Sequence, residues 1–398
     1  MAIETMETTS WGQRLRQSMG SVVLGGMLAA SMLGMLFWNE GRAVHRAQAL
    51  DEGAGAVRAA ELARFDPRNE GQLVHVSGPL RTAAALTDPV LGVQAPAVRL
   101  ERSVEMFQWV EERSTEKDVA LGGSETQRTR YSYRTEWKAS AQDASKFQQP
   151  AGHSNPPLRM ERAALVVPSA TLGIWSLGSP VLQTLGDWQP WAVPAAQLPA
   201  VQQALQKVLG ANTRVHAIPE GLFVGANPAQ PQVGDYRIRY RRVPVQTISI
   251  VAKQSGTSLV AYPTRNGQPL LLTQSGSVPA QAMFTTAHED NSTLSWVLRA
   301  VGLGLLMLAL QWVLRPLSVL ASVVPMLGTL VAWGTGTVAA VLGLLLGALT
   351  ISVAWLVYRP WVSLTVLVLA AAVAAALVWR KRRKARAHVP ATMPQPQG

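Results

Sequence analysis

Two apolar stretches dominate the hydropathy pattern of the chain, one at residues 19–38 and one at residues 294–379. A helix needs about 20 apolar residues to cross a hydrocarbon layer of about 30 Å. The first stretch therefore predicts one transmembrane helix. The second is long enough for several, and its only charged side chains, Arg299, Arg315 and Arg359, divide it at intervals.

The second stretch predicts transmembrane helices at 294–314, 336–357 and 360–379. Arg315-Pro316 ends the first of these, and Arg359-Pro360 precedes the last. Residues 315–335 are interrupted by a proline and glycines, which predicts a re-entrant or interfacial segment packed on its neighbours. Gly343 and Gly347 form a G-x-x-x-G pair that permits close helix packing, although glycine is also simply frequent in membrane helices.

Basic residues beside the two apolar stretches predict the orientation. Arg14 and Arg16 precede the first stretch, and the run Arg380 to Lys384 follows the second. The positive-inside rule places residues 1–18 and the tail 380–398 in the cytoplasm. Two ends on one side require an even number of crossings, so four are expected, with residues 39–293 on the extracytoplasmic side. No small-residue cleavage site follows residue 38, which favours an uncleaved signal anchor.

Residues 39–293 show the alternation that is typical of β-strands. Apolar and polar side chains alternate at 98–111, 131–138 and 236–241, and shorter strands are predicted at 247–252 and 259–262. The polar link 114–128 is expected to be a hairpin or an exposed loop. Residues 199–210 form an amphipathic helix that stops at Gly210. The predicted fold class is therefore an α+β membrane protein, with four transmembrane helices and a large β-rich domain between the first two.

The net charge of +12 suggests nucleic-acid binding until it is divided along the chain. Residues outside 39–293 carry +9 of it and the predicted domain only +3. Basic residues beside a membrane set orientation and meet anionic lipid, so lipid is the expected partner and nucleic acid is not. The absence of cysteine excludes disulfides, thiolate metal sites and a cysteine nucleophile.

No catalytic motif accompanies these segments. The chain has no phosphate-binding loop, nucleophile elbow, H-E-x-x-H or dinucleotide-binding glycine pattern, and its six histidines are isolated. Glu105 and Glu111 share a strand face but lie roughly 20 Å apart, too far to act on one bond. The arginine row at 237, 239 and 241 is expected to be a solvated strand face, with phosphate, lipid or a protein as alternative contacts. We predict no catalytic, cofactor-binding or metal-binding residue, and hence no enzyme.

Several stretches, rather than one short motif, carry a resemblance to a known family. They are the run Phe37 to Ala43, the run Arg102 to Glu111, the strand Tyr131 to Trp137 and the segment His153 to Pro156. These stretches closely resemble the TMEM43 (transmembrane protein 43, LUMA) family of membrane proteins, nearly to the end of the chain. The resemblance marks as family-motif and membrane-boundary candidates Asn39, Glu40, Gly41, Arg42, Glu105, Gln108, Trp109, His153, Asn155, Arg299, Arg315, Pro316, Arg359 and Pro360.

The resemblance implies a multi-span protein with one large domain between spans one and two. In animals the family is associated with the endoplasmic reticulum and inner nuclear membrane, in membrane organisation and protein complexes. The arginine-rich, alanine-rich composition resembles that of a high-GC bacterial gene, which implies a cytoplasmic membrane with a periplasmic domain. The leading hypothesis is a non-enzymatic scaffold that self-associates and engages lipid or other membrane or periplasmic proteins. A pore or transport component and a membrane-bound hydrolase are the alternatives. Arg299 is expected to snorkel to the interface rather than to conduct.

Overall fold

The structure, a computed structural model, describes residues 3–219, 221–361, 364–365 and 368. It divides into two compact units: a domain of residues 1–14 and 46–291, and a helical unit of residues 15–45 and 292–398. Nearly all of the predicted transmembrane helix 360–379 and the whole tail 380–398 lie outside the described residues.

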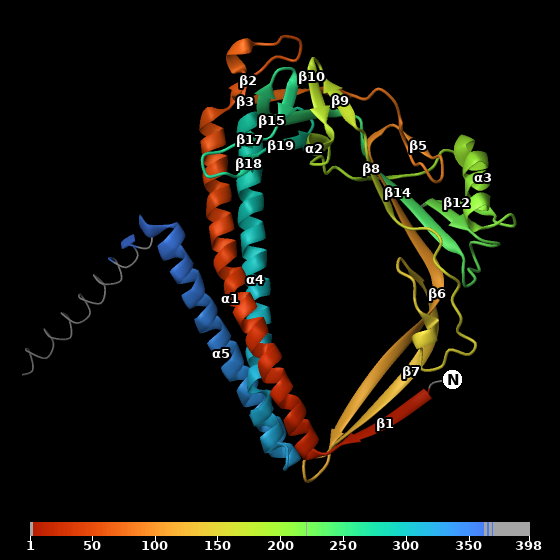
Figure 1. Ribbon diagram of the computed structural model, residues 1–398, viewed down its shortest axis with the longest axis vertical. Coiled ribbons are helices and arrows are strands. Elements are labelled where there is room, and N and C mark those ends of the chain that lie inside the picture. Colours follow the sequence, from red (N-terminus) through yellow and green to blue (C-terminus); the bar gives the residue numbers. More distant parts are fainter. Residues whose placement is uncertain (1–2, 220, 362–363, 366–367, 369–398) are drawn as a thin grey trace, which may run out of the picture. The chain divides into compact units, whose positions relative to one another are not determined.

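The larger sheet of the domain has eight strands, joined through antiparallel pairs. Its order is β1-β7-β6-β14-β13-β12, with β11 also on β14 and β8 also on β6. These strands are β1 (Ile3–Thr9), β6 (Ala97–Val119), β7 (Glu125–Lys138), β8 (Ala163–Val166), β11 (Gln189–Trp191), β12 (Val215–Ile218), β13 (Gly221–Val224) and β14 (Tyr236–Pro244). The predicted strands at 98–111, 131–138 and 236–241 are confirmed within β6, β7 and β14. The polar link at 114–128 is the outer part of the long β6–β7 hairpin, which Figure 1 shows as an extended ribbon.

The second sheet has seven strands, in the order β19-β15-β16-β10-β9-β3-β2, with β15 also on β3. They are β2 (Arg58–Ala59), β3 (Leu73–Arg81), β9 (Ser169–Leu172), β10 (Trp175–Gly178), β15 (Thr247–Ser255), β16 (Ser258–Val260) and β19 (Leu272–Ser275). Two small hairpins, β4 (Leu86–Thr87) with β5 (Gln94–Ala95) and β17 (Tyr262–Pro263) with β18 (Pro269–Leu270), complete the β-structure of the described residues. The fully buried Trp175 is the largest side chain of the core that this sheet shares with α2 (Ser179–Leu182).

The predicted helix at 199–210 is confirmed as α3 (Leu198–Leu209). Val201 and Leu205 on its apolar face are fully buried against the larger sheet. Gly210 ends the helix at φ +121°, a conformation that side chains with a Cβ rarely adopt. Helix α3 therefore covers one end of the larger sheet, as Figure 1 shows.

The N-terminal segment differs from the prediction of a polar tail at 1–18. Residues 3–9 form β1, which pairs with β7 from Ile3↔Tyr131 to Thr9↔Glu125. Ion pairs from Glu4 to Arg130 (2.7 Å) and from Arg14 to Glu125 (3.1 Å) flank the pairing. Residues 3–9 are polar on both faces of the strand, and they form one because β7 offers them a free edge. Strand pairing places residues 3–9 in the same compartment as the hairpin, which conflicts with the assignment of residues 1–18 and the domain to opposite sides.

A cysteine pair tests this placement, since the chain has no other cysteine. The hydroxyls of Thr8 and Thr126 lie 3.4 Å apart on directly opposed positions. We expect Thr8→Cys with Thr126→Cys to form a disulfide under mild oxidation in native membranes, detected by mass spectrometry. The control, Thr8→Cys with Thr129→Cys, is about 10 Å out of register and should not crosslink. Equal yields from the two pairs would contradict the pairing.

Three helices of the described residues are long and apolar enough to cross a membrane. They are α1 (Trp11–Ala56), α4 (Ala280–Ala321) and α5 (Pro325–Tyr358). The predicted spans at 19–38, 294–314 and 336–357 lie within them. At 1.5 Å per residue each helix exceeds the hydrocarbon thickness, and α1 and α4 continue into polar sequence beyond their apolar stretches.

The predicted re-entrant or interfacial segment at 315–335 is helical apart from a short break at residues 322–324. Helix α4 continues through Pro316 to Ala321, and α5 begins at Pro325. A proline inside a helix leaves the carbonyl four residues earlier without its donor, here that of Trp312. The hydroxyl of Ser21 on α1 lies 3.0 Å from this carbonyl, but it has one hydrogen and lies closer, at 2.6 Å, to the backbone oxygen of Ser18. The helix continues through the proline all the same.

Candidate functional site

The helical unit contains a buried ion pair that joins all three of its described helices. Glu40 of α1 accepts two hydrogen bonds from Arg299 of α4, from Nε at 2.6 Å and from Nη2 at 2.7 Å. The indole nitrogen of Trp355 on α5 donates to the same carboxylate at 2.8 Å. Glu40 is only 2% exposed. Such bidentate, charge-assisted bonds fix distance and orientation together.

A second layer of polar contacts surrounds this pair. Asn39 is fully buried and donates to the backbone oxygen (3.2 Å) and the hydroxyl (3.3 Å) of Ser295 on α4. Arg42 donates to the side-chain oxygen of Asn39 from Nε (3.4 Å) and Nη2 (3.2 Å). The guanidinium of Arg299 lies 4.7 Å from the ring centre of Trp296. These contacts hold α1 and α4 in a single register.

Glycines bring the same helices close together. A Cβ at Gly41 would lie 2.6 Å from the ring of Tyr358, and one at Gly302 would lie 2.7 Å from Met35. Gly343 and Gly347 contact Met307 and Leu303 of α4, where a Cβ would overlap both. The G-x-x-x-G pair therefore serves the packing of α5 on α4 within one chain.

The structure brings together four of the motif candidates near the end of the first apolar stretch, Asn39, Glu40, Gly41 and Arg42, with Arg299. The side chain of Arg299, expected to snorkel to the interface, is 16% exposed and paired with Glu40. Arg315 and Pro316 lie four turns further along α4, and Arg359 and Pro360 follow the last residue of α5.

Sequence analysis missed Ser295, Trp355 and Tyr358. The sequence did contain a signal for the ion pair, because Glu40 lies beside one apolar stretch and Arg299 lies inside the other.

The motif candidates of the domain form a different cluster, which fastens residues 139–157 to the β6–β7 hairpin. Asn155 accepts from the backbone N–H of Trp109 (2.8 Å) and donates to the oxygens of Trp109 (3.0 Å) and Gln142 (3.1 Å). Gln108 is fully buried; it donates to the oxygen of Ser140 (3.1 Å) and accepts from Gln142 (2.8 Å). The side-chain amides of Asn155 and Gln108 thus make hydrogen bonds between the loop and the hairpin, in place of the backbone bonds of a neighbouring strand.

His153 belongs to the same cluster. Its ring stacks on Tyr133 with centroids 4.0 Å apart, meets Trp109 edge-on at 4.8 Å, and Nδ1 lies 2.9 Å from the oxygen of Gln149. The hydroxyl of Tyr133 donates to Glu111 at 3.0 Å. These contacts position the loop, which is a structural role.

Replacing Asn155 with alanine removes three hydrogen bonds at once and should cost about 2–4 kcal/mol at about 1 kcal/mol for each net bond. Hydrogen exchange should accelerate at the amides of Trp109 and Gln142 and stay unchanged in β15. The exposed Asn212 offers a control, because its alanine variant should leave the exchange of both amides unchanged. Unchanged exchange in Asn155→Ala would contradict the fastening role.

The arginine row is paired with acids, whereas a solvated strand face was expected for it. Glu105 pairs with Arg237 (2.7 Å) and Arg239 (2.9 Å) across β6 and β14. Glu101 pairs with Arg241 (2.8 Å) and Arg162 (3.1 Å). Burial alone would raise the pKa of Glu101, but hydrogen bonds from these two arginines leave it below its usual value. The row is therefore neutralised by acids of the neighbouring strand.

The two motif clusters are separate, and neither lines the concave pocket of about 790 Å³ that the domain carries near the end of α3. Among the described residues no group of three or more histidine, aspartate or glutamate side chains could hold a metal ion. The motif residues are used for packing and for fastening elements of the fold.

Comparisons with known proteins identify one family of membrane proteins. Residues 106–360 match the family model of Transmembrane protein 43. The chain is similar to Transmembrane protein 43 of Homo sapiens, with 31% identity over 90% of this chain and 89% of the human protein. It is similar to the Rattus norvegicus protein at 31% identity over 88% of each chain, and to the Drosophila melanogaster homologue at 29% over 88% of this chain and 92% of that one. No solved structure matches the chain.

Proposed function

Because this chain belongs to the transmembrane protein 43 family, we propose that it is a non-enzymatic membrane scaffold that self-associates and holds a β-rich domain at the membrane surface. The helical unit supplies the anchor, and the domain supplies the surface for lipid or other membrane and periplasmic proteins. It is a multi-pass membrane protein by family and by its apolar helices.

The observation that carries this proposal is the ion pair between Glu40 and Arg299. Charged residues at membrane depth commonly serve proton relays, ion pathways or substrates. Here both charges are satisfied by each other, by Trp355 and by the polar layer around Asn39. Polar groups used in this way fix the register of helices, which is what a scaffold requires.

We further propose a bacterial cytoplasmic membrane, with the basic segment 380–384 in the cytoplasm and the bulk of the domain in the periplasm. The charge division along the chain supports this orientation. The Thr8–Thr126 crosslink tests whether residues 1–14 share a compartment with the hairpin.

Self-association would use the lipid-facing side of α5. Leu345 and Leu349 are 61% and 60% exposed and lie one turn apart, whereas Ala354 is fully buried. The G-x-x-x-G pair is occupied within the chain, so contact between copies falls to such outer positions.

Single cysteine variants of the full chain test self-association in native membranes. We expect Leu345→Cys or Leu349→Cys to give dimers with a short bismaleimide. The buried control, Ala354→Cys, should remain monomeric. Monomers alone at both outer positions, with intact reactivity toward a small maleimide, would contradict self-association through this face.

A further inference from the structure

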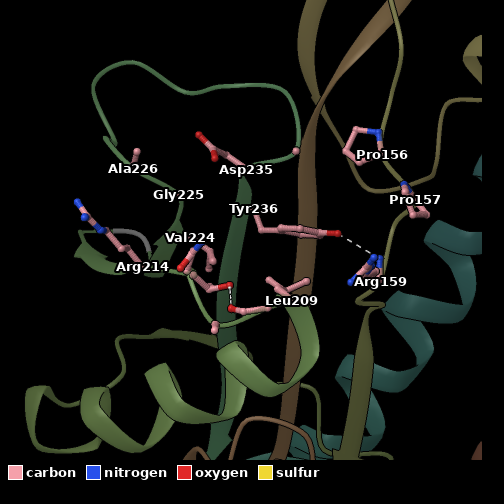
Figure 2. Close-up of a pocket in the computed structure, with 15 residues that line it drawn as sticks. Pro156, Pro157, Arg159, Leu209, Arg214, Val224, Gly225, Ala226, Asp235 and Tyr236 are labelled. Atoms are coloured by element: carbon pink, nitrogen blue, oxygen red, sulfur yellow. Dashed lines mark hydrogen bonds between the residues drawn. The ribbon is translucent and has the colours of Figure 1, made fainter.

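The domain carries a pocket of about 790 Å³ that the roles above do not use (Figure 2). Its walls come from the end of α3 and the turn after it up to Arg214, from the end of β13 and the start of β14, and from the segments that follow and precede these two strands. Pro156, Pro157 and Arg159 close the remaining side. This volume is in the range of small-molecule sites, which is about 300–1,000 Å³. All of the lining belongs to the domain.

The charged residues of the lining are Arg159, Arg214 and Asp235. Both arginines are exposed, and among the described residues neither guanidinium has a carboxylate within ion-pair distance. This sets them apart from Arg237, Arg239 and Arg241 of the same domain, which are all paired with glutamates. The pocket therefore holds two positive charges that the protein itself does not neutralise.

Figure 2 shows Arg214 and Arg159 on opposite sides of the pocket, with Asp235 and Tyr236 between them. Asp235 is half-buried, accepts a hydrogen bond from the backbone of Gln232 at 2.7 Å, and lies so close to Gly225 that a Cβ there would overlap its carboxylate. Burial raises the pKa of Asp235. The hydroxyl of Tyr236 is fixed by the backbone N–H of Arg159 at 3.1 Å. The order of charges across the pocket is thus positive, negative, positive.

We propose that this pocket binds an elongated ligand with a phosphate group at each end and hydroxyl groups between them. Arg159 and Arg214 would each hold one phosphate, because guanidinium and phosphate match in charge and in fork geometry. Asp235 would accept a hydrogen bond from a central hydroxyl. A soluble sugar bisphosphate and a lipid headgroup with two phosphates bridged by glycerol share this chemistry.

The test uses the full chain in nanodiscs of neutral lipid and measures binding by calorimetry. The probes are inorganic phosphate and fructose 1,6-bisphosphate, and in a second arm vesicles with or without cardiolipin. We expect a bisphosphate or cardiolipin to bind at least about tenfold more tightly than inorganic phosphate or neutral vesicles. Arg159→Gln and Arg214→Gln should each remove about that factor, since each deletes one charge-assisted contact.

Arg81→Gln is the matched control, because Arg81 is exposed on the same domain and lies outside the pocket. It should change the affinity less than twofold. Gly225→Ala, which displaces Asp235, should weaken the bisphosphate more than inorganic phosphate. Binding in one arm only identifies the source of the ligand. An equal loss in Arg81→Gln, or no binding of any probe, would overturn the proposal, and neither result would alter crosslinking through α5.

Discussion

Replacing Glu40 with alanine is expected to lower the free energy of unfolding of the helical unit by about 3–5 kcal/mol, because the substitution leaves Arg299 as a buried charge without its counter-ion. Arg299→Gln should cost a similar amount, since it strands a carboxylate that is 2% exposed. The measurement is unfolding of the purified chain in mixed micelles, followed by tryptophan fluorescence.

A double-mutant cycle separates the ion pair from general damage. Glu40→Gln with Arg299→Gln should be more stable than the sum of the losses measured for Glu40→Gln alone and Arg299→Gln alone predicts, by about 1.5 kcal/mol or more, because neither charge is then unpaired. Trp355→Phe removes one hydrogen bond from the same carboxylate and should cost only about 1–2 kcal/mol. Strict additivity of the two charge removals would show that the pair does not hold the helices together.

The strands that sequence analysis found are those with one buried face. Residues 102–109 alternate between buried and half-exposed positions, and apolar residues recur at every second position around them, at 98, 100, 104 and 106. The outer part of β6, from Arg113 to Asp118, is exposed throughout, as is most of β1. A ribbon that is polar on both faces has the composition of a loop, so only its pairing identifies it as a strand.

The predicted helix 294–314 is shorter than α4, which ends at Ala321, for a related reason. Pro316 reads as a break because a proline removes one helical hydrogen bond. Helix α4 nevertheless continues to Ala321. Local sequence contains the proline but not the tertiary packing around it, so it predicts a re-entrant or interfacial segment at 315–335.

The helical site could have been predicted further than it was. Asn39, Glu40, Arg42 and Arg299 were all singled out, but each was interpreted alone. A carboxylate and a guanidinium at the edges of two apolar helices each carry a desolvation cost, which falls if they pair. The contribution of Trp355 depends on how α5 packs, and its sequence carries no signal of that contact.

The buried network of Asp88 in the domain carries a second large effect. Asp88 is fully buried and accepts from Arg102 Nη1 (2.7 Å), from the hydroxyl of Tyr240 (2.7 Å) and from the backbone N–H of Val90 (2.9 Å). Burial, and then the neighbouring carboxylate, raises the pKa of Tyr240, so its hydroxyl remains a donor. Every partner of Asp88 is therefore a donor, and Arg102 is only 4% exposed.

Asp88→Asn is expected to destabilise the domain by about 3–5 kcal/mol, because it leaves Arg102 without a counter-ion and turns an amide N–H₂ toward other donors. At about 2–4 °C per kcal/mol for a domain of this size, the melting temperature should fall by about 6–20 °C. Tyr240→Phe, which removes one hydroxyl and keeps the ion pair, should cost about 1–2 kcal/mol. Asp88→Asn with Arg102→Met removes both charges and should recover part of the loss. A double variant as unstable as the two single losses combined would mean that the damage comes from lost packing and hydrogen bonds, and that the unpaired arginine contributes little.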